Sequence, residues 1–84
     1  MDRLLWQSLK KKITTMNNIL KLRKVLDTLP PFCRDFFRGI EPYTSTRTRL
    51  AYAYDIRLFF EFLHETNSYC KKREITELPL SVLD

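Results

Sequence analysis

The sequence predicts an all-α fold, a small orthogonal bundle of about four helices, and three observations support this prediction. The 84 residues include a single Gly and no Asn-Gly or Asp-Gly pair, so the residues that hairpin turns between strands favour are missing. Apolar residues recur at intervals of three and four along most of the chain, which is helical spacing. Four Pro residues separate the periodic stretches. The length fits one domain with a small core.

The first periodic stretch covers residues 2–27. Its apolar residues form one stripe, Leu5, Leu9, Ile13, Met16 and Leu20, and an adjacent one, Ile19, Leu22, Leu26 and Leu29. The run Thr-Thr-Met-Asn-Asn at residues 14–18 contains weak helix formers that favour caps. We therefore expect a break there, or a frayed first helix followed by a firmer one from about Asn18. Residues 1–17 are then a helical extension, and residues 18–84 are the domain proper.

A short second helix is expected from Pro31 to Arg38. Pro31 suits a first helical turn, where the N–H that it lacks would have no partner, and Gly39 offers a C-cap. The apolar face of this helix consists of Phe32, Cys33, Phe36, Phe37 and Ile40. Because buried aromatic residues dominate small cores, we expect Phe36 and Phe37 to be core residues rather than a binding surface.

The third helix has the clearest helical pattern in the sequence. Thr44 or Ser45 can cap its N-terminus, and about twenty residues of helical spacing follow. One stripe, at intervals of four, four, three and four, consists of Thr48, Tyr52, Ile56, Phe59 and Leu63. We expect this stripe to face the core. A second line, Leu50, Tyr54 and Leu58, lies on the far side and is expected to pack against the N-terminal helix, a partner domain or DNA.

The C-terminal part is expected to be irregular at first. Asn67 and Ser68 end the third helix, residues 71–73 (Lys-Lys-Arg) form a basic loop, and residues 75–79 are extended. A new apolar pattern begins at Leu80 and stops at Asp84, which indicates a truncated last helix and a fragment of a longer protein.

The residue inventory argues against several classes of function. With two Cys (Cys33 and Cys70), no C-x-x-C pair and one His, we expect free thiols and neither a disulfide framework nor a metal site. His64 alone could act as a base near neutral pH, and no nucleophile elbow or phosphate loop is present, so we expect no catalysis, no cofactor and no small-molecule substrate. No apolar run is long enough to span a bilayer, and residues 10–12 are all Lys, so the expected location is the cytoplasm, without a membrane partner.

The charge distribution favours an anionic partner. The net charge is +5, and residues 1–49 hold eleven Lys or Arg against four Asp or Glu, whereas residues 50–84 hold four against six. A basic balance of this kind is typical of proteins that bind nucleic acid or an anionic membrane. The short basic runs at residues 10–12 and 71–73 are weaker indications, because such runs are usually solvated charge.

Residues 43–49, Tyr-Thr-Ser-Thr-Arg-Thr-Arg, form a candidate phosphate site. Four Ser or Thr side chains and two Arg precede or enter the first turn of a helix, where unpaired N–H groups and the positive end of the helix dipole attract anions. An ordinary N-cap rich in Ser and Thr explains the same pattern equally well.

The third helix also carries a family resemblance. The pattern Ser45-Thr46-Arg47-Thr48, Tyr52, Asp55-Ile56, Phe59 and Phe62-Leu63 resembles the SAM-like, N-terminal core-binding domain of tyrosine recombinases of the phage integrase family. That family has Ser-x-x-Thr, a Tyr four residues later, an Asp-Leu pair, and a Phe followed by an aromatic-Leu pair. Residues 29–37, Leu-Pro-Pro-Phe-Cys-Arg-Asp-Phe-Phe, are similar to the short first helix of that domain. The resemblance covers about residues 18–84.

The resemblance implies a set of DNA contacts. In that family the domain clamps duplex DNA from the face opposite the catalytic domain. By position, Ser45, Arg47 and Arg49 become the DNA contacts and Thr44 and Thr46 phosphate hydrogen-bond donors, with Lys71, Lys72 and Arg73 as weaker candidates. Tyr52, Ile56, Phe59 and Leu63 become core. Ala53 and Tyr54 stand where the family often has basic residues, and the catalytic Arg, His and Tyr belong to a C-terminal domain that these residues do not include.

The sequence thus predicts a non-catalytic, double-stranded DNA-binding domain of a site-specific recombinase, acting in DNA integration and recombination. Its partners would be DNA, the catalytic domain of the parent protein and other recombinase protomers. One alternative is a helical protein-interaction or oligomerisation module whose surface consists of Leu50, Tyr54 and Leu58 with Trp6 and Leu5. A second is a transcription-factor-like reader built on two angled helices, which would show strong sequence preference.

Overall fold

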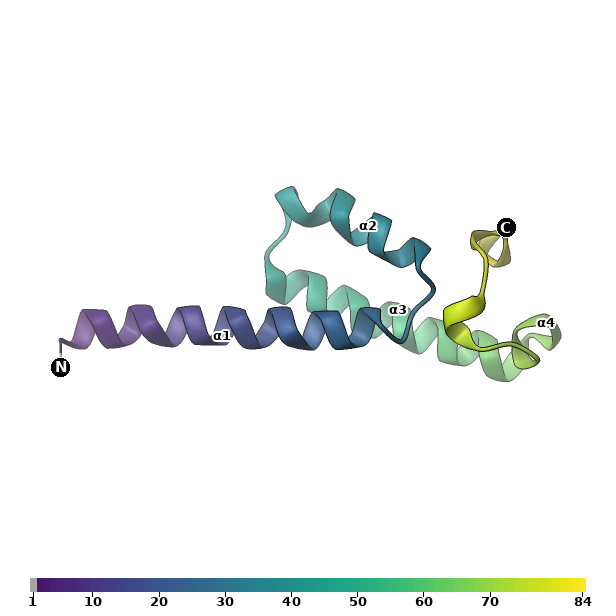
Figure 1. Ribbon diagram of the computed structural model, residues 1–84, viewed down its shortest axis with the longest axis horizontal. Coiled ribbons are helices and arrows are strands. Elements are labelled where there is room, and N and C mark those ends of the chain that lie inside the picture. Colours follow the sequence, from purple (N-terminus) through teal and green to yellow (C-terminus); the bar gives the residue numbers. More distant parts are fainter. Residues whose placement is uncertain (1) are drawn as a thin grey trace.

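The computed structural model describes residues 2–84, and within these residues the chain is all-α, as predicted (Figure 1). It contains four α-helices: α1 (Arg3–Leu26), α2 (Phe32–Ile40), α3 (Thr46–Thr66) and α4 (Ser68–Lys71). Three 3₁₀ turns join or follow them: η1 (Glu41–Tyr43), η2 (Ile75–Glu77) and η3 (Leu80–Leu83). None of these helices is both long and apolar enough to cross a membrane, within the part of the chain described.

The three longer helices run lengthwise rather than crossing at right angles (Figure 1). The C-terminal half of α1 lies beside the first half of α3, and α2 runs above both in the view of Figure 1. The N-terminal half of α1 projects beyond the other elements, so the molecule is elongated, with extents of 58 × 22 × 15 Å. The bundle therefore covers only one part of its longest helix.

Helix α1 is continuous through residues 14–18, so the break expected there is wrong. Each weak helix former costs only about 0.5 kcal/mol relative to Ala, and neighbouring turns have already met the cost of nucleation. At the N-terminus, the carboxylate of Asp2 accepts a hydrogen bond from the Leu4 N–H at 3.0 Å. Residues 2–17 are all exposed, and Asn18 is the first partly buried residue of the helix.

Helix α2 begins at Phe32 with Pro31 as its N-cap, one residue later than expected, and Gly39 does not cap it. The helix continues to Ile40 and then tightens into η1, and no described residue has the positive φ that a Gly cap would use. Phe37 is buried, whereas Phe36 is half exposed, so the prediction that both are core residues is wrong for Phe36. Phe32 joins α2 to α3 through an edge-to-face contact with Phe60, with ring centroids 6.0 Å apart.

Helix α3 presents a different face to the core from the one that its strongest stripe indicated. Its buried residues are Leu50, Ala53 and Phe60, while Tyr52 and Phe59, predicted to be core, are each 44% exposed. Ile56 and Leu63 pack partly against the core. The face that packs against α1 and Phe32 of α2 is neither of the two stripes seen in the sequence but the one between them, with Leu50, Ala53 and Phe60. Leu50 therefore does not belong to a free surface with Tyr54 and Leu58.

Among residues 2–84, Pro30 is buried and the core cluster contains nine buried apolar side chains: Val25, Leu29, Cys33, Phe37, Leu50, Ala53, Phe60, Cys70 and Leu78. Both cysteines are free, as expected, and burial raises the pKa of the Cys33 thiol above its usual value. A thiol in such surroundings is a packing residue rather than a reactive one.

The C-terminal segment is more helical than predicted. Asn67 caps the unpredicted helix α4, and its side-chain oxygen accepts hydrogen bonds from the N–H groups of Tyr69 (2.9 Å) and Cys70 (3.2 Å). The stretch expected to be extended contains the turn η2, so that prediction is wrong for Ile75–Glu77. Leu80–Leu83, where a truncated last helix was expected, forms the turn η3. Leu78 lies between the two turns and anchors them to the core.

Candidate nucleic-acid interface

Ser45 is the N-cap of α3, as the sequence suggested. Its hydroxyl oxygen accepts a hydrogen bond from the Thr48 N–H at 3.1 Å and donates to the Thr48 hydroxyl at 2.9 Å. This is the geometry of an ordinary N-cap. The Ser45 hydroxyl is therefore committed to its own helix, and its contribution to anion binding is to fix the direction in which α3 begins.

Arg49 holds the loop before α3 in place. Its guanidinium donates to the backbone oxygens of Glu41 (3.1 Å) and Thr44, and to the hydroxyl oxygens of Thr44 (3.2 Å) and Thr46 (3.1 Å). The Thr44 hydroxyl itself donates to the Ile40 carbonyl at 2.7 Å. These contacts use most of the hydrogen-bonding capacity of Arg49 and the only O–H of Thr44. We therefore assign both to positioning of the loop rather than to direct phosphate contact.

Replacing Arg49 with Ala is expected to lower the free energy of unfolding by about 1–2 kcal/mol, because two backbone carbonyls and two hydroxyls lose a charged donor. Arg49→Lys should recover little of this, because one ammonium cannot reproduce the spread of a guanidinium fork. Arg47→Ala, at an exposed position on the same turn, is the control and should change stability by less than about 0.5 kcal/mol. Urea denaturation measures all three variants. Equal stabilities of Arg49→Ala and Arg47→Ala would contradict the positioning role.

A basic groove lies where the start of α3 meets the middle of α1. Three of its lining residues are at the start of α3 (the N-cap Ser45, Thr46 and Arg47) and six are in α1 (Gln7, Lys10, Lys11, Thr14, Thr15 and Asn18). Its volume is about 540 Å³. Lys10, Lys11 and Arg47 supply its charge, and no acidic residue is among the described residues that line it. The groove is therefore an open, positively charged surface with hydroxyl and amide groups beside the cations, a combination suited to an anion.

The α1 side of this groove was missed by the sequence reasoning, which treated the Lys run at residues 10–12 as solvated charge. A sequence indication did exist. Gln7, Lys11, Thr14 and Asn18 follow one another at intervals of four, three and four, and the same stripe continues into Leu22 and the buried Val25. Polar residues in line with a buried stripe must face the neighbouring helix, or the space just beyond its end.

The second predicted basic group lies at the other end of α3. Lys71 ends α4, and Lys72 and Arg73 follow it, about 30 Å from Ser45 if α3 rises 1.5 Å per residue. Arg73 donates to the Tyr69 carbonyl at 2.7 Å and stacks on the Tyr69 ring at 3.5 Å. Lys71, Lys72 and Arg73 are therefore not part of the groove that contains Arg47. The guanidinium of Arg73 is already engaged with Tyr69.

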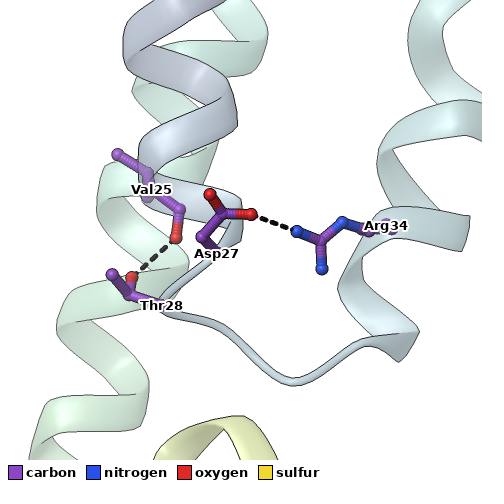
Figure 2. A network of polar contacts seen from close by, with 4 residues as sticks. All are labelled: Val25, Asp27, Thr28 and Arg34. Atoms are coloured by element: carbon purple, nitrogen blue, oxygen red, sulfur yellow. Dashed lines mark hydrogen bonds and ion pairs between the residues drawn. The ribbon is translucent and has the colours of Figure 1, made fainter.

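A further group of arginines lies between α1 and α2. Arg23, Arg34, Arg38 and Arg49 line a cleft of about 390 Å³ with Glu41. Figure 2 shows Asp27, at the end of α1, accepting a hydrogen bond from Arg34, beside the contact of the Thr28 hydroxyl with the Val25 carbonyl. Asp35 faces Arg38 at 3.8 Å. Because carboxylates accompany these arginines, the cleft is less suited to an anionic ligand than the groove.

No protein-family model, curated protein or solved structure matches this chain.

Proposed function

We propose that this chain binds duplex DNA without catalysing a reaction on it, as the core-binding clamp of a site-specific tyrosine recombinase or integrase. The observation that carries the DNA-binding part is the groove, in which Lys10, Lys11 and Arg47 converge from two helices. The residue pattern from Ser45 to Leu63 supports the recombinase part, because it resembles the core-binding domain of that family. The proposed place of action is the cytoplasm, on DNA and beside a catalytic domain and other recombinase protomers.

Within this proposal the groove residues divide into two tasks. Lys10, Lys11 and Arg47 pair with phosphates of the backbone, and the Thr46 hydroxyl, whose oxygen already accepts from Arg49, still has its O–H to donate. Ser45 and Arg49 hold the loop before α3 and the first turn of that helix in place. Phosphate contacts position a protein on DNA without reading its sequence, so the isolated chain should bind weakly and with little base preference.

Titration of a random duplex of about 30 base pairs at several salt concentrations, read by fluorescence anisotropy, tests the proposal. With three cations on phosphates, log K should fall against log salt with a slope of about −2.7, at roughly −0.9 per contact. Backbone amide chemical shifts should move at Thr46 and Arg47 and along Gln7 to Asn18. Absence of binding at low salt would refute the proposal.

The same titration with unrelated duplexes separates this proposal from the transcription-factor-like alternative. Affinities for different sequences should agree within a few-fold, because the groove offers phosphate contacts. A reader that docks a helix in the major groove would discriminate between sites by on the order of 10³-fold or more. Strong discrimination by this chain alone would therefore favour the alternative.

A further inference from the structure

The exposed side of α1 carries a regular apolar seam. Its members are Trp6, Leu9, Ile13, Met16 and Leu20, at intervals of three, four, three and four. Each is between 38% and 61% exposed. At 100° per residue the seam lies roughly opposite the stripe of Asn18, Leu22 and Val25, which faces the rest of the bundle. No described element of the chain can therefore cover it.

The shape of the seam indicates what could cover it. Its five residues follow the a and d positions of a heptad repeat, with Leu5 and Ile19 beside them. This alternation of three and four, kept over five members, is typical of contact with a single helix, whose side chains interdigitate with the seam.

The residues that flank the seam indicate the charge of that helix. Helix α1 contains seven Lys or Arg and no Asp or Glu. On one side the seam is bordered by Arg3, Lys10, Asn17 and Lys24, and on the other by Leu5, Lys12 and Ile19. A second copy of α1 would bring the same cations to this border and no anion, so self-pairing gains no ion pair and adds repulsion. Acidic residues would complement the border.

We propose that the seam docks an acidic amphipathic helix of a partner protein, with aliphatic residues in its apolar stripe and Glu or Asp beside it. Apolar contact with the seam supplies the affinity, and the basic border selects the partner and its alignment. This surface lies on the side of α1 away from most of the groove, and it is distinct from the Leu50, Tyr54 and Leu58 line, whose first member is buried. The inference does not depend on DNA binding.

Trp6, the one Trp of the chain, makes the test direct. The probe is a synthetic peptide about three heptads long, without Trp, carrying Ile at a, Leu at d and Glu at e and g. Titrated into the full chain, it should shift the Trp6 emission to shorter wavelength, saturably, and the affinity should fall as salt rises. A peptide with Lys in place of Glu should bind at least about tenfold more weakly.

Two variants with matched chemistry show where the peptide binds. Leu9→Gln with Ile13→Gln removes two members of the seam and should weaken binding by about 100-fold. Leu4→Gln with Leu58→Gln removes two strongly exposed leucines outside the seam, one on α1 and one on α3, and should leave binding unchanged. Circular dichroism should show that both variants stay folded, since all four residues are exposed.

Several outcomes would overturn the proposal. Equal binding of the Glu and Lys peptides would show that the basic border does not select the partner. Equal losses of peptide affinity in the two double variants would show that the seam is not the binding surface. A dimer of the chain alone by light scattering, abolished by Leu9→Gln with Ile13→Gln, would make a second copy the occupant. A shift of Trp6 emission with vesicles of anionic phospholipid, but not with the Glu peptide, would make it a lipid surface.

Discussion

Replacing Phe60 with Ala is expected to unfold a large fraction of the protein at room temperature. Phe60 is 2% exposed, and its ring contacts those of Phe32 (6.0 Å) and Phe59 (5.5 Å). Removing a buried Phe side chain costs about 3–5 kcal/mol. A core of this size supplies roughly the same amount. The radius of gyration of 16.3 Å, against about 12 Å for a compact chain of this length, shows how little of the elongated molecule the core covers.

Phe62→Ala is the matched control for this prediction. Phe62 lies on the same helix two residues later but is 60% exposed, so its loss should change the free energy of unfolding by less than about 1 kcal/mol. Urea denaturation followed by far-UV circular dichroism measures both variants. Similar destabilisation by the two changes would mean that the buried face of α3 has been placed wrongly.

Replacing Lys10, Lys11 and Arg47 together with Ala is expected to abolish most of the affinity for DNA. If each cation neutralises one phosphate, the slope of log K against log salt should become less negative by about 2.7. The affinity at moderate salt should fall on the order of 10²-fold. All three residues are exposed, so the fold should be unaffected. Anisotropy titrations at several salt concentrations, with a circular dichroism spectrum of the variant, check both statements.

The control removes the same amount of charge elsewhere on α1. Replacing Lys12, Lys21 and Lys24 with Ala also lowers the net charge from +5 to +2, but none of these residues lines the groove. If the groove binds phosphate directly, the salt dependence of DNA affinity should change much less in this variant than in the groove variant. Equal losses in the two triple variants would show that DNA responds to the overall charge of the chain and not to the groove.

The elements whose formation depends on near neighbours were predictable from the sequence. The start of α2 after Pro31, the Ser45 cap and the length of α3 follow from interactions within about four residues along the chain. The break predicted at residues 14–18 is absent. The propensity cost there is a few tenths of a kcal/mol per residue, which is smaller than the stabilisation that continuing an already nucleated helix provides.

The candidate site could be predicted only in part. The hydroxyl-rich entry to α3 and the basic side chain of Arg47 were visible in the sequence. That Arg49 hydrogen-bonds to its own loop was not, because the loop carbonyls that it reaches belong to residues five and eight positions away and are brought close by the turn η1.

The sequence alone determined that the chain would fold into helices, roughly where most of them begin, and that its N-terminal half would be basic. Tertiary structure decided which face of α3 is buried, which groups of the loop accept hydrogen bonds from Arg49, and that Lys10 and Lys11 share a groove with Arg47. The physical reason is the range of the interactions. Caps and helical periodicity act within one or two turns, whereas the buried face of a helix with two apolar stripes is fixed only by the helix that packs against it.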